Sequence, residues 1–332
     1  MRNQIIQGSV LDDSTWSQIP DRHVQCCITS PPYWGLRDYG VEGQLGLEST
    51  PEEYVERMVE VFRQVWRVLR DDGTLWLNLG DSYAGSVGNR NGSNSSTLKG
   101  GVGGCAADAA VNRKVIHKPI FTGLKPKDLC GIPWRVALAL QADGWYLRQD
   151  IIWHKPNPMP ESVRDRCTKA HEYLFLLTKK PKYYCDMEAV KEPAVCANPE
   201  HVNYRKNGKS DKRSNAQVDS MGKPGFGDDM YKQPHVRNKR SVWTVTTKPY
   251  KEAHFATFPP KLIEPCVKAG CPEGGIILDP FMGSGTTGMV AKQHGRDHLG
   301  IELNPEYIEM IQKRIGAVDP LFTRKERQCT QQ

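Results

Sequence analysis

A short apolar run ends at Ser30-Pro31-Pro32-Tyr33, a turn that contains two adjacent prolines. Each proline lacks a backbone N–H and fixes its own φ angle, so the chain can continue here neither as a helix nor as a central strand. The turn therefore holds a hydroxyl, an exposed backbone carbonyl and an aromatic ring in one stiff arrangement. Two hydrogen-bond acceptors held beside an aromatic ring could together bind a ligand.

A second candidate site lies near the other end of the chain, where the apolar run 275–279 ends in Asp279. The glycine-rich segment that follows leads into a helix predicted from about Thr286 to Gln293. Such loops let a ligand approach the backbone near the positive end of a helix. The segment lacks the lysine of a Walker loop, but Gly283-x-Gly285-x-x-Gly288 matches the dinucleotide fingerprint. Alone, that match is weak.

A second predicted strand, 298–302, ends in Glu302, and a carboxylate there can bind both hydroxyls of a ribose. Asn304 and Pro305 then begin another helix. NAD sites and S-adenosylmethionine sites share this unit of strand, glycine loop, helix, strand and acid. Two strand-end acids argue against a purely structural glycine turn, and a hydride-transfer enzyme has no evident use for the double-proline turn.

The elements around these motifs predict an α/β fold. Strands are expected at 5–6, 24–29 and 74–79, and a capping box of Thr50 and Glu53 begins a helix that Asp71-Asp72-Gly73 should end. Strands that alternate with amphipathic helices are typical of a parallel sheet. A helix at 133–142 and strands at 145–153 and 173–177 continue the pattern, after a Gly- and Ser-rich loop at 84–118.

Composition sets the broad class of protein. The chain has 332 residues, 38% of them hydrophobic and 25% charged, which predicts a packed core. No apolar run is long enough to cross a bilayer, and no signal peptide is evident, so we expect a cytoplasmic protein. Ten cysteines without a CxxC pair indicate reduced thiols and no metal site.

Residues 190–250 form a basic segment that supplies +6 of the net charge of +7. Amide and aromatic residues are interleaved with the cations. Composition alone fits a solvated insertion and a nucleic-acid surface equally well, since cations contact phosphates and amides read base edges. The candidate DNA contacts are Arg205, Lys206, Lys212, Arg213, Arg237, Lys239 and Arg240.

The double-proline turn and the loop 279–287, taken together, resemble the amino-methylating DNA methyltransferases, which modify N4 of cytosine or N6 of adenine. The resemblance covers roughly residues 5–317. The order of turn, basic insertion and glycine loop is similar to the permuted β-type arrangement of that family. It implies a doubly wound, mostly parallel sheet with the methyltransferase fold. It also implies a catalytic half at 1–189, a target-recognition insertion at 190–250, a cofactor-binding half at 251–317 and a tail at 318–332.

The resemblance also implies roles for individual residues. The Ser30 side chain and the Pro31 carbonyl would accept hydrogen bonds from the target amine, Pro32 would stiffen the turn, and Tyr33 would stack on a flipped base. S-adenosylmethionine would be bound by Phe258, Pro259, Asp279, Phe281, Gly283, Gly285, Thr286, Thr287 and Glu302. Relatives often carry Gly-Asp where this chain has Gly8-Ser9, which leaves Asp12 as a substitute contact.

Three further residues keep two interpretations each, and a fourth, Glu172, has one. Asp81 fits a strand-end acid of the site or a surface turn, and Trp34 fits a second stacking ring or a core residue. Lys155 fits a phosphate contact or a structural role. Glu172 precedes a buried strand and is interpreted as structural rather than catalytic.

The sequence thus predicts a site-specific DNA methyltransferase, with serine at the first position of the turn favouring cytosine N4 over adenine N6. Expected partners are double-stranded DNA and a restriction endonuclease of the same system, in a prokaryotic or phage-infected cell, with the enzyme a monomer or homodimer. A methyltransferase of protein or RNA would have the cofactor loop before the turn, and here the order is reversed. A DNA reader without activity would not need Ser30, Tyr33, Asp279 and Glu302 together.

Overall fold

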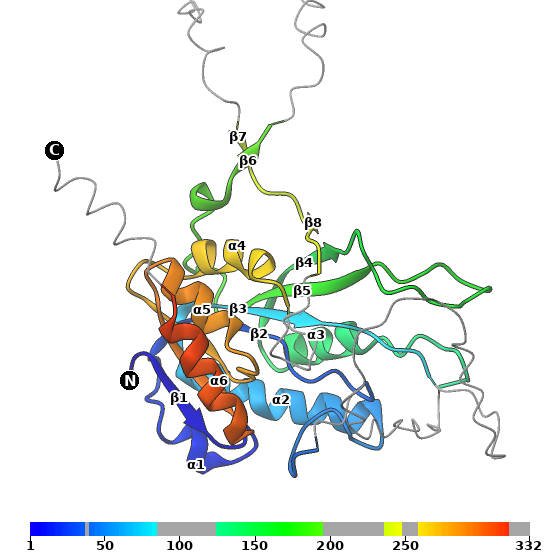
Figure 1. Cartoon of the computed structure of the whole chain (residues 1–332), viewed down its shortest axis with the longest axis horizontal. Helices are drawn as coiled ribbons and strands as arrows, with labels where there is room; N and C mark the ends of the chain where they lie inside the picture. Colours follow the sequence, from blue (N-terminus) through cyan, green and yellow to red (C-terminus); the bar gives the residue numbers. More distant parts are fainter. Residues whose placement is uncertain (37–39, 85–123, 195–235, 248–257, 319–332) are drawn as a thin grey trace, which may run out of the picture. The chain divides into compact units, whose positions relative to one another are not determined.

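Eight strands pair in the order β1-β10-β9-β2-β3-β5-β4-β8 in the computed structural model, which describes residues 1–36, 40–84, 124–194, 236–247 and 258–318 (Figure 1). All neighbours are parallel except that β5 is antiparallel to both β3 and β4. The strands are β1 (Gln4–Gln7), β2 (Val24–Thr29), β3 (Leu69–Leu79), β4 (Tyr146–His154), β5 (His171–Thr178), β8 (Val242–Thr244), β9 (Ile276–Asp279) and β10 (Asp297–Glu302). The prediction of a mostly parallel α/β sheet is confirmed.

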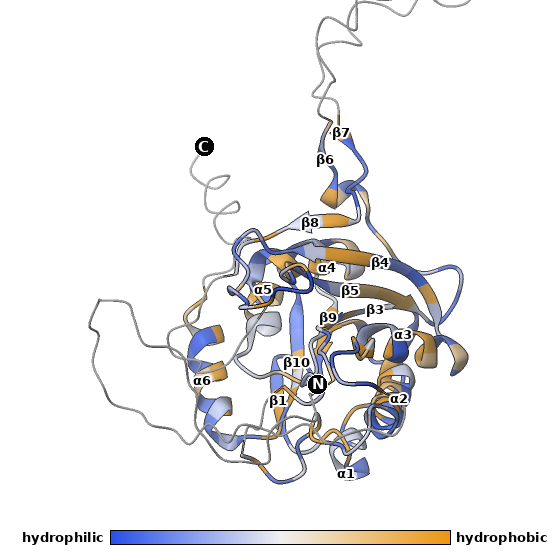
Figure 2. Ribbon diagram, turned by 90° about the vertical axis from the view of Figure 1, so that its right-hand side faces the viewer, coloured by the Kyte–Doolittle hydropathy of each residue, from blue (hydrophilic) through white to orange (hydrophobic). Residues whose placement is uncertain are grey.

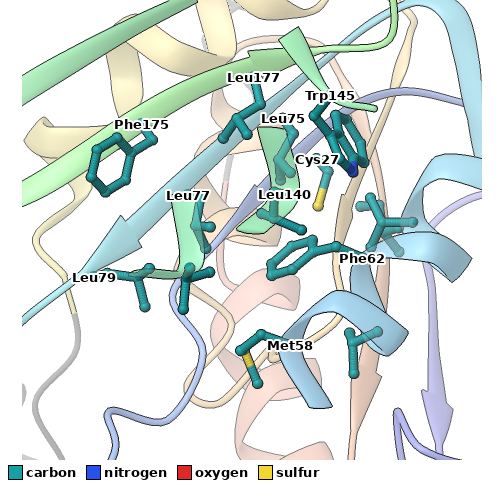
Figure 3. Packing of buried hydrophobic residues seen from close by; sticks show 14 of the residues in the cluster. Cys27, Met58, Phe62, Leu75, Leu77, Leu79, Leu140, Trp145, Phe175 and Leu177 are labelled. Carbon is teal, nitrogen blue, oxygen red and sulfur yellow. The ribbon is translucent and has the colours of Figure 1, made fainter. Parts of the chain in front are cut away.

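Helices cover the two faces of this sheet. Side chains alternate along a strand, so Cys27, Leu75 and Leu77 point to the face that holds α2 and α3, where they pack with Met58 and Phe62 (Figure 3). Helix α4 packs against Cys26 and Trp76 on the other face. The helices are α1 (Asp13–Trp16), α2 (Pro51–Val68), α3 (Ile132–Ala142), α4 (Pro260–Gly270), α5 (Thr286–Gln293) and α6 (Pro305–Gly316).

Helix α2 begins as predicted. The Thr50 side chain accepts from the Glu53 amide at 3.1 Å, and the Glu53 carboxylate accepts from the Thr50 amide at 3.3 Å. The helix is amphipathic, with hydrophobic and hydrophilic residues alternating along its ribbon (Figure 2). Its predicted end is wrong, because Leu69 already has an extended backbone and residues 71–73 belong to β3. Asp71 forms ion pairs with Lys179 and Lys180, which stabilise this extension of the strand.

The chain connections run outward in opposite directions from the pair β9 and β2. From β9 the chain continues to β10, whereas from β2 it continues to β3 on the other side. In open α/β sheets, ligands bind beyond the carboxyl ends of the strands at such a switch point. The fold therefore points to the ends of β2 and β9.

Residues Met187–Arg240 form a compact unit apart from Met1–Asp186 and Ser241–Gln332. Its described part holds a short 3-10 helix (Glu188–Val190) and the antiparallel pair β6 (Glu192–Pro193) and β7 (Val236–Arg237). The boundaries predicted at 189 and 250 stay predictions. Apart from Ala84 and Val318, the predicted loop 84–118 and tail 318–332 lie outside the described residues.

Candidate active site

The double-proline turn and the glycine loop meet at the switch point of the sheet. Strands β2 and β9 are neighbours, with Cys27 opposite Leu278, so their carboxyl ends lie at the same edge. There Thr29 Oγ1 donates a hydrogen bond of 2.7 Å to Asp279 Oδ1. Two motifs about 250 residues apart in sequence are thus in direct contact.

Asp279 is buried and anchors the loop. Burial raises the pKa of its carboxyl to about 6, against hydrogen bonds from Thr287, Thr29 and the Phe281 amide that favour the ionised form. The Thr287 hydroxyl donates to Asp279 Oδ2 at 2.6 Å, and the Phe281 amide donates to Oδ1 at 3.1 Å. This carboxylate therefore fixes the start of the glycine loop and its link to β2.

Glu302 ends β10 beside the same loop and is only 8% exposed. Burial raises the pKa of its carboxyl to about 7, and the charge of Asp279 acts in the same direction. Its oxygens accept hydrogen bonds from the Asn304 amide at 2.9 Å and the Gly283 amide at 2.7 Å. A carboxylate has about four acceptor positions, so capacity remains for a ligand.

Two glycines shape the loop for different reasons. Gly283 has φ +50°, and a side chain there would meet only the Phe281 carbonyl oxygen, at 3.8 Å, so the backbone faces open space. Gly285 has φ +75°, and its missing Cβ would lie 2.6 Å from Ile311. Gly283 therefore leaves the loop backbone accessible to a ligand, and Gly285 allows α6 to pack closely against the loop.

The two threonines predicted to bind the cofactor are buried, and their hydroxyls have partners within the protein. Thr287 binds Asp279, as described, whereas Thr286 Oγ1 accepts from Arg314 Nη1 at 3.1 Å. Arg314 also donates to the Ser284 carbonyl at 2.8 Å. Their side chains therefore hold the loop in shape.

The residues around Gly283 fit an adenosyl group. Glu302 has acceptor capacity for ribose hydroxyls, and the open backbone at Gly283 lies beside it. Two half-buried rings also lie near these elements in sequence: Phe281 follows β9, and Phe258 precedes α4. Pro259 is the buried N-cap residue of α4. Asp12 is exposed at the start of α1, and residues 254–257 lie outside the described part of the chain.

The turn after β2 keeps one carbonyl available. Pro32 is engaged, because the Tyr54 hydroxyl donates to its carbonyl at 2.9 Å. The Pro31 carbonyl accepts no hydrogen bond from any described residue. Trp34 is 1% exposed and donates to the Glu48 carbonyl at 3.0 Å, which makes it a core residue rather than a stacking ring.

Tyr33 is held from several sides. Its hydroxyl lies 2.8 Å from Glu172 Oε2 and 3.0 Å from Asn78 Oδ1, and 3.4 Å from Ser30 Oγ. Burial raises the pKa of the phenol well above its usual value, and the charge of Glu172 adds to this. A Cβ on Gly80 would lie 2.4 Å from the Tyr33 ring, so a glycine is required there.

Sequence reasoning missed this network around Tyr33. Glu172 contacts a residue of the turn and forms an ion pair with Lys155, which places it beside the candidate site, and its interpretation as structural rather than catalytic stays a prediction. Asn78 lies on β3 and Glu172 on β5, and no short motif links them to the turn. Asp81 caps α3, since its carboxylate accepts from the Gly131 and Ile132 amides at 3.1 and 3.0 Å.

The candidate DNA contacts belong largely to undescribed segments. Arg205, Lys206, Lys212 and Arg213 lie outside the described residues. Arg237 and Arg240 each donate to the same oxygen of Glu192, at 3.0 and 2.8 Å, within the unit Met187–Arg240, and Lys239 lies between them in sequence.

Other features of the described residues lie apart from this site. No three His, Cys, Asp or Glu side chains of the described ranges gather as a metal site, and no described helix is long and apolar enough to cross a membrane. A cavity of about 580 Å³ lies beside β1 and the end of α6, and its lining includes neither of the strand-end acids nor the turn.

Residues 24–313 match the DNA methylase family, and the chain belongs to that family. It is an S-adenosylmethionine-dependent DNA methyltransferase, as the sequence predicted. The chain is 45% identical over 317 residues to the Type II methyltransferase M.Cfr9I of Citrobacter freundii, covering 95% of this chain and 88% of that protein. It is 47% identical over 291 residues to M.SmaI of Serratia marcescens, covering 87% and 83%.

Solved structures share the fold. The PvuII DNA methyltransferase, described as cytosine-N4-specific, matches with a TM-score of 0.60 at 17% identity, over 96% of this chain and 87% of that one. A DNA modification methylase of Thermus thermophilus, solved with S-adenosylmethionine, matches with a TM-score of 0.55 at 20% identity, over 95% and 93%. The predicted methyltransferase fold is confirmed.

Proposed function

We propose that the chain methylates the exocyclic N4 amine of cytosine at a specific sequence in double-stranded DNA. The observation that carries this proposal is the residue before the two prolines, which is Ser30, a neutral hydroxyl, rather than a carboxylate. In the family that the chain resembles, serine at this position goes more often with cytosine N4 and aspartate with adenine N6.

Methyl transfer to an exocyclic amine requires two hydrogen-bond acceptors. An exocyclic amine is a poor nucleophile because its lone pair is delocalised into the ring. Acceptors at its two N–H groups draw the nitrogen toward tetrahedral geometry and stabilise the positive charge that develops. The Ser30 hydroxyl and the Pro31 carbonyl are the acceptors, and the latter has no competing partner among the described residues.

The base must also leave the duplex, which costs a few kcal/mol. Stacking on an aromatic face returns roughly 1–3 kcal/mol per base. The partly buried Tyr33 ring supplies that face, and its hydroxyl bonds hold it in one orientation.

Glu302, Gly283 and the rings of Phe281 and Phe258 hold the cofactor in this proposal, while Asp279 orders the loop. S-adenosylmethionine supplies an electrophilic methyl group when bound. The names of the Type II relatives and of the cytosine-N4-specific structure support the assignment to DNA modification, with a restriction endonuclease of the same system as a partner. Basic residues between 190 and 250 recognise the target sequence.

The product nucleoside tests the proposal. Duplex DNA is methylated with labelled S-adenosylmethionine, digested to nucleosides and analysed by mass. Labelled N4-methyldeoxycytidine is the expected product. N6-methyldeoxyadenosine would overturn the choice of base. It would leave the site assignment standing, because both amines need the same two acceptors.

A further inference from the structure

The Tyr33 hydroxyl connects Ser30 to a carboxylate on another strand. Ser30 Oγ lies 3.4 Å from Tyr33 Oη, which in turn lies 2.8 Å from Glu172 Oε2 and 3.0 Å from Asn78 Oδ1. Ser30 and Tyr33 belong to the turn after β2, Asn78 to β3 and Glu172 to β5. The chain of contacts therefore depends on the tertiary fold.

Both strand residues are acceptors toward the phenol. The Asn78 amide is oriented by its Nδ2, which donates to the Tyr173 carbonyl at 3.0 Å, so Oδ1 faces Tyr33. Glu172 forms an ion pair with Lys155, and an ionised carboxylate accepts hydrogen bonds without donating any. Neither partner can give a proton to Tyr33 Oη.

The direction of the hydrogen bonds follows from the number of acceptors around Tyr33 Oη. A phenol has one proton, and here two acceptors compete for it, so that proton points away from Ser30. The oxygen of Tyr33 is then left as an acceptor, and the Ser30 O–H donates to it. The remaining lone pairs of Ser30 Oγ are free to face a ligand.

We propose that Glu172 is a positioning residue that acts through the Tyr33 hydroxyl to keep Ser30 an acceptor toward the target amine. This inference rests on the role of Ser30 in the proposed function. A serine hydroxyl can donate as well as accept, and a proton aimed at an amine N–H would oppose binding. The network removes that orientation, and it lets a neutral serine serve where a carboxylate would otherwise be needed.

Glu172 lies in a cluster of charged groups. Lys155, Lys169 and His171 face it, and burial lowers the pKa of both Lys169 and His171. The Lys169 ammonium is buried without a hydrogen-bond partner among the described residues. Removing the Glu172 charge takes away the ion-pair partner of Lys155 and one of the carboxylates near Lys169, so a test needs a second variant that keeps the ion pair.

The experiment measures the single-turnover rate of methyl transfer to duplex DNA at saturating cofactor. Glu172→Gln, Tyr33→Phe and the double variant are compared with the wild type. Tyr33→Phe keeps the stacking ring and the Lys155–Glu172 pair and removes only the hydroxyl. Glu264→Gln is the matched control, because Glu264 pairs with Lys268 on α4, away from the turn. Cofactor affinity is measured separately.

We expect Glu172→Gln and Tyr33→Phe each to lower the rate by about tenfold or more, with cofactor affinity within about twofold of the wild type. The double variant should be no slower than Tyr33→Phe alone, because Glu172 acts through the hydroxyl that is already missing. Glu264→Gln should match the wild type.

A rate for Glu172→Gln within about twofold of the wild type would overturn the inference. So would a double variant whose rate falls by the product of the two factors measured for the single variants. If Glu172→Gln does not fold, Tyr33→Phe decides alone, and a near-normal rate for it would overturn the inference. Absence of methyl transfer by the wild type would instead count against the proposed function.

Discussion

The ionisation of the Glu302 carboxyl makes cofactor binding a pH-dependent property in the proposed site. A carboxylate accepts two ribose hydroxyls only when it is ionised, and burial raises its pKa to about 7. If Glu302 binds the ribose as proposed, cofactor binding has to displace a proton from this carboxyl below that pH. For one group of this pKa, affinity should tighten by about tenfold between pH 6 and pH 8.

Calorimetry with S-adenosylmethionine at pH 6, 7 and 8 measures this dependence. Glu302→Gln should bind more than about tenfold more weakly than the wild type at pH 8, or about 1.4 kcal/mol, and should lose the tightening with pH. Asp279, with a pKa raised to about 6, titrates at the lower edge of this range, and the glutamine variant separates the two acids because it retains Asp279. Equal tightening in both proteins would refute the role given to Glu302.

The residues that the sequence reveals are those in short motifs. Ser30, Tyr33, Asp279 and Glu302 stand out because prolines, glycines and strand-end acids mark them locally. Nothing in the sequence marks Glu172 as a partner of Tyr33, since they are 139 residues apart and meet only because β5 pairs with β3. The interpretation of Glu172 as structural followed from its local sequence alone.

At the scale of elements, the end of β3 shapes the turn after β2. Gly80 follows β3, and a Cβ there would lie 2.4 Å from the Tyr33 ring. Gly80→Ala must therefore displace the ring and disturb its bonds to Asn78 and Glu172. Overpacking of this kind costs about 1–3 kcal/mol.

We expect Gly80→Ala to lower turnover by about tenfold or more while cofactor affinity stays within about twofold, because the three atoms nearest to the added Cβ all belong to Tyr33. Gly316→Ala is the control, since a Cβ at the end of α6 meets nothing within 4 Å. Turnover assays and cofactor titrations on both variants check this. Normal turnover in Gly80→Ala would show that the ring position is not critical.

Element boundaries were predictable where side chains cap a helix and less so elsewhere. The capping box of Thr50 and Glu53 and the Asn304 cap of α6 lie where the sequence indicated. The segment Asp71-Asp72-Gly73 suggested a turn, but ion pairs from Lys179 and Lys180 keep it in β3. Those lysines come from beyond β5, so the local sequence could not reveal them.

At the scale of the molecule, the sheet brings together two motifs that a basic segment separates in sequence. The strands β6 and β7 flank residues 194–235, and Pro193 pairs with Val236. A two-residue Asn-Gly turn can therefore replace residues 194–235 and close the hairpin. This excision tests the role of the segment with little disturbance to the sheet.

The excised protein should bind S-adenosylmethionine within about twofold of the full chain and bind duplex DNA about tenfold more weakly or worse, with a shallower dependence on salt. The excision removes Arg205, Lys206, Lys212 and Arg213, which we predict to contact phosphates or bases. Fluorescence titrations with duplex DNA at several salt concentrations measure it. Methylation of the same sites at an unchanged rate would move target recognition elsewhere in the chain.

In the proposed function, the turn at Ser30 directs methyl transfer to cytosine N4, and the mass of the labelled nucleoside is the most direct test of this assignment. Wild-type protein and Ser30→Ala are incubated side by side with duplex DNA and labelled S-adenosylmethionine, and both digests are analysed. We expect N4-methyldeoxycytidine from the wild type and a loss of about tenfold or more of that product from Ser30→Ala, with cofactor affinity retained. Labelled N6-methyldeoxyadenosine, or equal N4-methyldeoxycytidine from both proteins, would contradict the proposal.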